Sequence, residues 1–188
     1  MNNDFYEFSE RLIFSQGERG DKAVKILRNA FPDCIDVRKT DKQTDRKGVD
    51  YVVKLKGGAE IGIDIKARDK GVAKYWRNGE EDLLIETWSV YPEEENEGVL
   101  GWTLSDKKAT NYVLYTFDET ESDKYYLLPF QLLRKAALNN IDKWRNEYKV
   151  KYACTKNPFG DNWRTQFICV PASVVLEAIT QSMSGVSA

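Results

Sequence analysis

A period of two dominates the stretch from Gly48 to Lys66, where apolar and polar residues alternate most clearly after Gly58. Such alternation is typical of β-strands, and the adjacent glycines Gly57 and Gly58 predict a hairpin between two of them. In the second strand every other side chain is an isoleucine: Ile61, Ile63 and Ile65. The strand therefore has one apolar face and one face that carries Asp64 and Lys66.

A helix is expected before this hairpin. Apolar residues recur at helical spacing at Val24, Leu27 and Phe31, and Pro32 ends the pattern. Ser15 and Glu18 have the spacing of a capping box at the helix start.

Further elements follow from the same patterns. Strands are expected over Cys34–Arg38, Leu83–Val90 and Tyr112–Phe117, and two strand-proline-helix units over Tyr125–Ala136 and Phe167–Ala178. The charged stretch Lys135–Lys151, which contains Trp144 and Arg145, is expected to continue the first of these helices and to face substrate or solvent. Together these elements predict an α/β protein with a central mixed β-sheet flanked by helices.

The hairpin loop decides which side chains share a face. A strict two-residue turn at Gly57-Gly58 would place Asp50 opposite Ile65, with its carboxylate toward the apolar side. A loop of three residues or a bulge is needed to bring Asp50 to the face of Lys66. Two adjacent glycines allow either arrangement.

Composition narrows the function classes. The chain has 188 residues and no histidine, which excludes Ser-His-Asp, Cys-His and other imidazole-based mechanisms. Three widely spaced cysteines, Cys34, Cys154 and Cys169, do not form a zinc motif. No apolar run has the length of a membrane span and the start is no signal peptide, so a cytoplasmic protein without membrane contact is expected.

Charge is unevenly distributed along the chain. Asp36 to Arg77 contains twelve Lys and Arg against seven Asp and Glu, whereas Glu80 to Glu97 contains eight acidic residues and no basic one. The basic stretch surrounds Asp64 and Lys66, where a polyanionic substrate would require it, although a solvated charged surface has the same composition. Candidate phosphate-binding residues are Lys42, Arg46, Lys47, Arg68, Lys107 and Lys108.

Asp50 followed by Asp64-Ile65-Lys66 resembles the motif of the PD-(D/E)XK nuclease superfamily, which includes restriction endonucleases and Holliday-junction resolvases. Val49 replaces the proline of the family motif. The resemblance implies a restriction endonuclease-like core over about 15–130. It also implies a single nuclease-like domain over 1–188, with strand-helix additions over about 131–181.

The resemblance also implies an activity: hydrolysis of DNA phosphodiester bonds by an endonuclease that depends on Mg²⁺ or Mn²⁺. Asp50 and Asp64 would hold the metal, and Lys66 would position the attacking water. A site residue on the first helix is expected at Glu18, with Asp21 as the alternative, and Glu86 is either a further ligand or a strand carboxylate.

Two further expectations accompany this hypothesis. By analogy with enzymes that cut both strands, a homodimer is an alternative to a monomer. The rival function is a catalytically inactive protein of the same fold that binds nucleic acid or protein.

Overall fold

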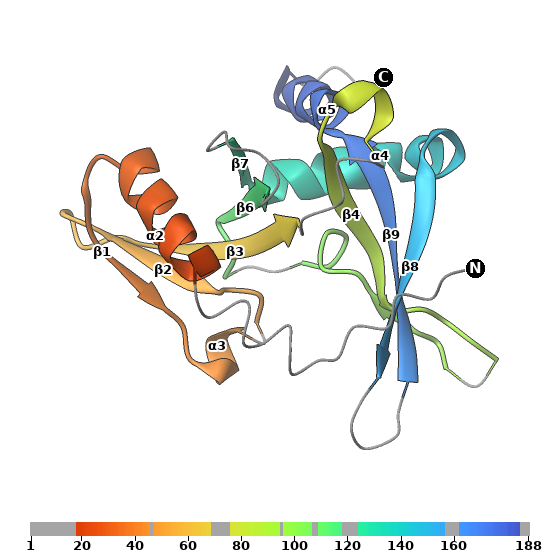
Figure 1. Cartoon of the computed structure of the whole chain (residues 1–188), viewed down its shortest axis with the longest axis horizontal. Coiled ribbons are helices and arrows are strands. Elements are labelled where there is room, and N and C mark those ends of the chain that lie inside the picture. Colours follow the sequence, from red (N-terminus) through yellow and green to blue (C-terminus); the bar gives the residue numbers. More distant parts are fainter. Residues whose placement is uncertain are drawn as a thin grey trace. The chain divides into compact units, whose positions relative to one another are not determined.

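The computed structural model describes residues 18–45, 47–68, 76–94, 96–106, 109–117, 124–156 and 162–184 (Figure 1). They form two compact units. The described residues of the mixed-sheet unit lie within 18–68 and 109–131, and those of the antiparallel-sheet unit lie within 76–106 and 132–184. Each unit draws on separate stretches of the chain, so the expectation of one domain over 1–188 stays a prediction.

The mixed-sheet unit contains five strands in the order β1-β2-β3-β6-β7. β3 and β6 are parallel, and the other neighbours are antiparallel. The α/β class with a mixed sheet is therefore confirmed for this unit. The strands are β1 (Cys34–Lys39), β2 (Tyr51–Leu55), β3 (Glu60–Arg68), β6 (Tyr112–Phe117) and β7 (Tyr125–Pro129).

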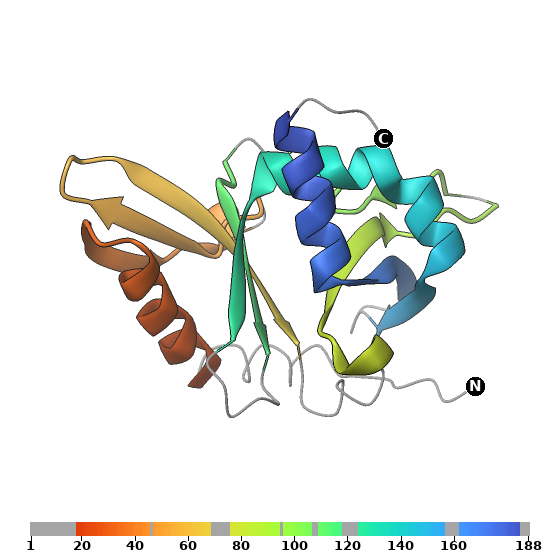
Figure 2. The same ribbon diagram turned by 90° about the horizontal axis from the view of Figure 1, so that it is seen from above.

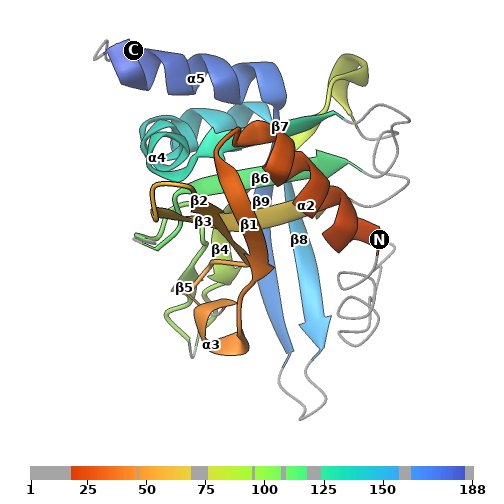
Figure 3. The ribbon, with the colours of Figure 1, turned by 90° about the vertical axis from the view of Figure 1, so that its left-hand side faces the viewer.

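Helix α2 (Glu18–Ala30) packs on one face of this sheet (Figure 3). Its buried residues Ala23, Ile26 and Leu27 join a core with Val53 and Ile63. Removing such apolar surface from water is the main favourable term in forming the unit. The isoleucine face of β3 is thus the core face, as the sequence pattern predicts.

The β2–β3 hairpin has the three-residue loop that the sequence required. Leu55 and Ala59 close it, because the Leu55 N–H donates to the Ala59 carbonyl at 2.9 Å. Gly58 occupies the last loop position with φ of +82°, a conformation that favours glycine. The resulting register pairs Tyr51 with Ile63.

The antiparallel-sheet unit contains a second sheet that the sequence analysis did not foresee. Its strand order is β5-β4-β9-β8, with every neighbouring pair antiparallel. The strands are β4 (Asp82–Val90), β5 (Val99–Leu100), β8 (Lys149–Lys156) and β9 (Asn162–Pro171). Helices α4 (Phe130–Glu147) and α5 (Ala172–Ser184) follow β7 and β9 directly, as the strand-proline-helix pattern predicts (Figure 2).

The expectation of a helix through Lys151 is wrong. α4 ends at Glu147, and Lys149 already begins β8. Trp144 does not face solvent either, since only 1% of it is exposed. The Trp144 indole lies in the last turn of α4 and is buried, so packing in the interior explains this aromatic residue without a substrate contact. Among the described helices, none is long and apolar enough to cross a membrane.

Candidate active site

Strand β3 carries Asp64 and Lys66 on the face opposite α2, because residues two apart on a strand point the same way. Both lie where β3 runs parallel to β6, with Asp64 beside Val113 and Lys66 beside Tyr115. Val113 and Tyr115 are fully buried. The two ionic side chains therefore stand on a rigid, interior part of the sheet.

Asp64 is an almost completely buried carboxylate, with 2% of the residue exposed. Its Oδ1 lies 2.8 Å from Nζ of Lys66, whose side chain is 30% exposed. Its Oδ2 is buried and has no hydrogen-bond partner among the residues that the structure describes. Because a buried carboxylate oxygen normally has a donor or a cation beside it, Oδ2 is a vacant acceptor for a cation.

Asp50 directly precedes β2, at the point where the regular pairing of β2 with β3 ends. Its backbone N–H donates to the Ile63 carbonyl at 2.8 Å, and its Oδ2 accepts the Ile65 N–H at 2.7 Å. The register between β2 and β3 ends with the pair Tyr51 and Ile63, and Asp50 lies one residue before it. The structure thus pairs Asp64 with Lys66 and anchors Asp50 to the backbone of the same strand, while a shared site for all three stays a prediction.

Gly62 explains how closely the chain packs beside this site. A Cβ at Gly62 would lie 2.2 Å from the Ala109 carbonyl oxygen. Asn111 binds the same glycine twice, since its Oδ1 accepts the Gly62 N–H at 2.7 Å and its N–H donates to the Gly62 carbonyl at 2.8 Å. The sequence analysis missed these two hydrogen bonds, although a glycine inside a strand can indicate that another backbone segment approaches closely.

The first turns of α2 lie at the end of the sheet that carries the site. Lys22 Nζ donates to the Phe117 carbonyl at 3.1 Å, and Phe117 pairs with Arg68 at the end of β3. Burial raises the pKa of the Tyr51 hydroxyl, and the negative charges of Asp50 and Asp21 raise it further. Asp21 is therefore close enough to Tyr51 to act on it electrostatically.

Glu18 begins α2, but its side chain lies outside the described part of the structure. Its expected role stays a prediction. Asp21, the alternative on the same helix, is exposed. Since α2 packs against the face of β3 opposite Asp64 and Lys66, the expected site role of Asp21 also stays a prediction.

The expected phosphate-binding residues are only partly described. Lys47 is exposed after the short helix α3 (Lys42–Asp45), and Arg68 is 8% exposed at the end of β3. The side chain of Lys42 and all of Arg46, Lys107 and Lys108 lie outside the described residues. Their binding roles stay predictions.

Glu86 has a structural explanation within the antiparallel-sheet unit. It lies on β4, and its Oε1 accepts hydrogen bonds from the Ser89 hydroxyl and from the Trp102 N–H. These bonds tie β4 to the turn at Trp102. They favour the strand-carboxylate interpretation over the metal-ligand one.

The donor set at Asp50 and Asp64 suits a hard divalent cation. In the described part of the chain no three His, Cys, Asp or Glu side chains converge as a metal cluster. Mg²⁺ does not need such a cluster, because it commonly binds one or two carboxylates together with water and substrate phosphates. The vacant Oδ2 of Asp64 is the observation that fits it.

Comparisons with known proteins identify no family for this chain. No family model matches it, and no curated protein and no solved structure matches it either. The case for a function therefore rests on the site.

Proposed function

We propose that this protein is a Mg²⁺-dependent nuclease that hydrolyses DNA phosphodiester bonds at the site formed by Asp50, Asp64 and Lys66. The buried Asp64 carboxylate carries the proposal, because its Oδ2 has no hydrogen-bond partner in the described part of the chain and its Oδ1 contacts Lys66. Mn²⁺ is expected to substitute for Mg²⁺. A cytoplasmic location, with a homodimer as the form that cuts two strands, belongs to the same proposal.

Asp64 and Asp50 would hold the ion, Asp64 through its vacant Oδ2. A bound Mg²⁺ supplies Lewis-acid stabilisation of the phosphoryl oxygens and lowers the pKa of water. Asp50 is fixed for this role, since the Ile65 N–H holds its carboxylate against β3. A carboxylate held by the backbone loses little freedom on binding a ligand.

Lys66 would act on the substrate rather than on the ion. Its ammonium is partly exposed while its partner is buried, so the lysine is the side of the pair that a phosphate reaches. A preorganised cation at this point stabilises the charge that develops on the phosphoryl oxygens and orients the attacking water. Without an ion, the same ammonium neutralises Asp64.

A second candidate function is nucleic-acid or protein binding without catalysis. It is favoured by the fact that the ionic groups already have structural partners: Lys66 binds Asp64, and Asp50 binds the Ile65 N–H. In that case the partly exposed Lys66 and the buried Asp64 are an ion pair that supports the sheet, and divalent ions have no effect.

Cleavage of DNA with and without divalent ions separates the two functions. Linear, circular, single-stranded and branched DNA are incubated with the protein in Mg²⁺, Mn²⁺ or EDTA. Metal-dependent products from the wild type and from Lys54→Ala, but not from Asp64→Asn, are expected. Lys54 is a matched control because it is an exposed lysine on β2. Absence of cleavage on every substrate, with retained DNA binding, would favour the binding protein.

A further inference from the structure

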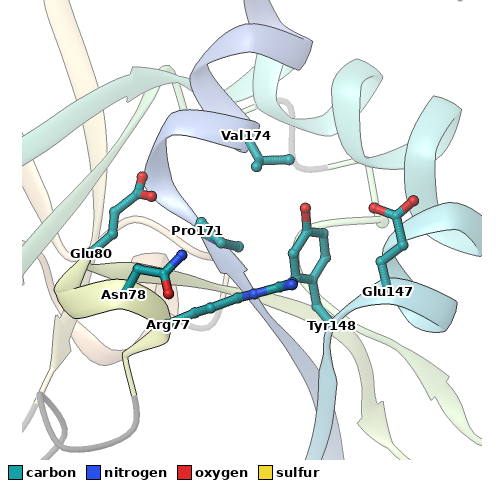
Figure 4. Close-up of a pocket in the computed structure, with 7 residues that line it drawn as sticks. All are labelled: Arg77, Asn78, Glu80, Glu147, Tyr148, Pro171 and Val174. Atoms are coloured by element: carbon teal, nitrogen blue, oxygen red, sulfur yellow. The ribbon is translucent and has the colours of Figure 1, made fainter.

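A cavity of about 470 Å³ lies within the antiparallel-sheet unit (Figure 4). Arg77 extends toward Tyr148, with its guanidinium 5.9 Å from the ring centre, and the carboxylates of Glu80 and Glu147 lie at opposite sides. Charges of both signs line this one cavity, so they select neither an anion nor a cation. The charges along the outer edge of the mixed sheet, by contrast, specify a partner.

Of the described strands, four lie at the edges of sheets: β1 and β7 in the mixed sheet, and β5 and β8 in the antiparallel sheet. Another strand can pair with such an edge unless a short strand, a proline or repelling charge prevents it. β5 has two residues, β7 ends in Pro129, and the charged residues of β8 are all lysines. β1 has six residues and carries both signs of charge, with an acid at Asp36 and bases at Arg38 and Lys39. Self-pairing would set lysines together in β8, whereas β1 can set an acid opposite a base.

The backbone of β1 directs hydrogen-bonding groups outward around Val37. The Thr40 N–H donates to the Asp50 carbonyl at 2.9 Å, so Thr40 points toward β2. Because these directions alternate along an antiparallel strand, Arg38 also points to β2, while Val37 and Lys39 point away from it. In the described sheet β1 has β2 as its one neighbour. An added strand would therefore form hydrogen bonds at Val37 and Lys39.

A two-fold axis at Val37 gives the register in which the charges match. Val37 of one copy would exchange both backbone hydrogen bonds with Val37 of the second copy. Asp36 of each copy then lies opposite Arg38 of the other, at positions between the hydrogen-bonded pairs, where facing side chains approach most closely. An axis at Lys39 would instead place two lysines opposite each other. An axis at Ile35 would bring no acid opposite a base.

The charges already present on this face of the sheet fit the same register. Asp36 pairs with Lys54 on β2, and Lys54 pairs with Glu60 on β3. With Arg38 of the second copy beyond Asp36, the row of four side chains alternates in sign. Arg38 Nη2 donates to both Glu60 oxygens, at 2.8 and 3.0 Å, and the Arg38 side chain is still 57% exposed. A guanidinium has five N–H donors, so it can bind a second carboxylate.

We propose that β1 pairs with β1 of a second copy of this chain, in antiparallel register about Val37, through two ion pairs between Asp36 and Arg38. Opposite residues of paired strands share a face, so the faces that carry Asp64 in the two copies would point the same way. Five strand spacings of about 4.8 Å would separate the two β3 strands by roughly 24 Å. A short strand pair buries little surface, so the dimer is weak and reversible. Its use in cutting two strands rests on the proposed function, but the pairing itself does not.

Sedimentation equilibrium in EDTA, without DNA, tests the pairing apart from cleavage. The wild type should show a reversible monomer–dimer equilibrium at micromolar concentrations. Asp36→Arg and Arg38→Asp should each weaken self-association at least tenfold, because like charges then face each other. Asp142→Arg is the control: it makes the same charge change at an exposed position of α4 and should associate like the wild type. Melting curves establish that each variant is folded.

A mixture of the two single variants tests the register. The Asp36→Arg chain has bases at positions 36 and 38 and the Arg38→Asp chain has acids there, so both ion pairs can form between unlike chains. The mixture should associate at least tenfold more tightly than either variant alone. A wild type that stays monomeric at near-millimolar concentration, a dimer unaffected by both substitutions, or a mixture no tighter than its components would overturn the pairing. A monomer that cleaves DNA would contradict the pairing alone, and a dimer that does not cleave would contradict the nuclease alone.

Discussion

The Asp50 carboxylate accepts the backbone N–H of Ile65 at 2.7 Å, and this bond takes the place of the next rung in the β2–β3 ladder. One side chain thus completes a strand pairing and, in the proposed function, also holds the metal ion. The two roles can be separated by substitution, because an amide oxygen accepts the same hydrogen bond without the negative charge.

Asp50→Asn should keep the free energy of unfolding within about 0.5 kcal/mol of the wild type, because the Asn oxygen still accepts the Ile65 N–H. Asp50→Ala leaves that N–H unpaired and should cost about 1–3 kcal/mol. Both variants should lose metal-dependent cleavage. Urea unfolding and a nuclease assay measure the two effects. An active Asp50→Asn would show that Asp50 is only a structural acceptor.

Magnesium should raise the melting temperature of the wild type, because an ion that binds only the folded state stabilises it. At ten times its dissociation constant the gain is about 1.4 kcal/mol, or roughly 3–6 °C for a chain of this size. Asp64→Asn should remove the response. Asp142→Asn, at an exposed position on α4, should retain it. An equal shift in Asp64→Asn and the wild type would place the ion elsewhere.

Gly62→Ala should destabilise the mixed-sheet unit, because the new Cβ would lie 2.2 Å from the Ala109 carbonyl oxygen and backbone atoms would have to move. Overpacking of this kind costs about 1–3 kcal/mol or more. Gly57→Ala is the matched control in the same hairpin, since no atom lies within 4 Å of its Cβ position. Thermal melts of the two variants should differ clearly. A Gly62→Ala protein as stable as Gly57→Ala would mean that the Ala109 segment does not pack there.

The site was predictable from the sequence where it depends on strand period. Asp64 and Lys66 meet because residues two apart share a face, and Gly57-Gly58 allowed the three-residue loop that the hypothesis required. The contact of Asp50 with Ile65 was not predictable. It depends on the backbone conformation at the start of β2, where the pairing with β3 ends. There the Thr40 N–H donates to the Asp50 carbonyl at 2.9 Å. That partner is ten residues away, and no local pattern marks it.

The second sheet was missed for a related reason. β8 begins one residue after the end of α4. Its lysines follow the charged residues of α4 in the sequence, so the sequence analysis interpreted them as part of the same charged helix. What makes it a strand is its pairing with β9 over the full length from Lys149 to Lys156. Tertiary pairing overrides local propensity in such segments. The burial of Trp144 was missed on the same grounds, because a single aromatic residue in a charged helix does not reveal which face is buried.

Lys66 distinguishes the enzyme from the binding protein most directly. Lys66→Ala removes the ammonium that lies 2.8 Å from Asp64 and leaves a buried carboxylate without its cation. Because Lys66 is itself partly exposed, a loss of about 1–3 kcal/mol in metal-free buffer is expected. Lys66→Arg should recover most of that stability, since it restores a positive charge. Unfolding in EDTA measures both.

Metal and DNA then separate the two interpretations of Lys66. In the nuclease, Mg²⁺ no longer competes with the ammonium in Lys66→Ala, so the melting temperature should rise more on adding Mg²⁺ than it does for the wild type. Cleavage should nevertheless fall about a hundred- to a thousand-fold, because a preorganised charge at the phosphoryl group is lost. Lys66→Arg should stay impaired despite its stability, since a planar guanidinium does not replace a compact ammonium. If Lys66→Ala cleaves DNA at the wild-type rate once Mg²⁺ has restored its stability, then Lys66 serves only to neutralise Asp64, and the proposed mechanism is wrong.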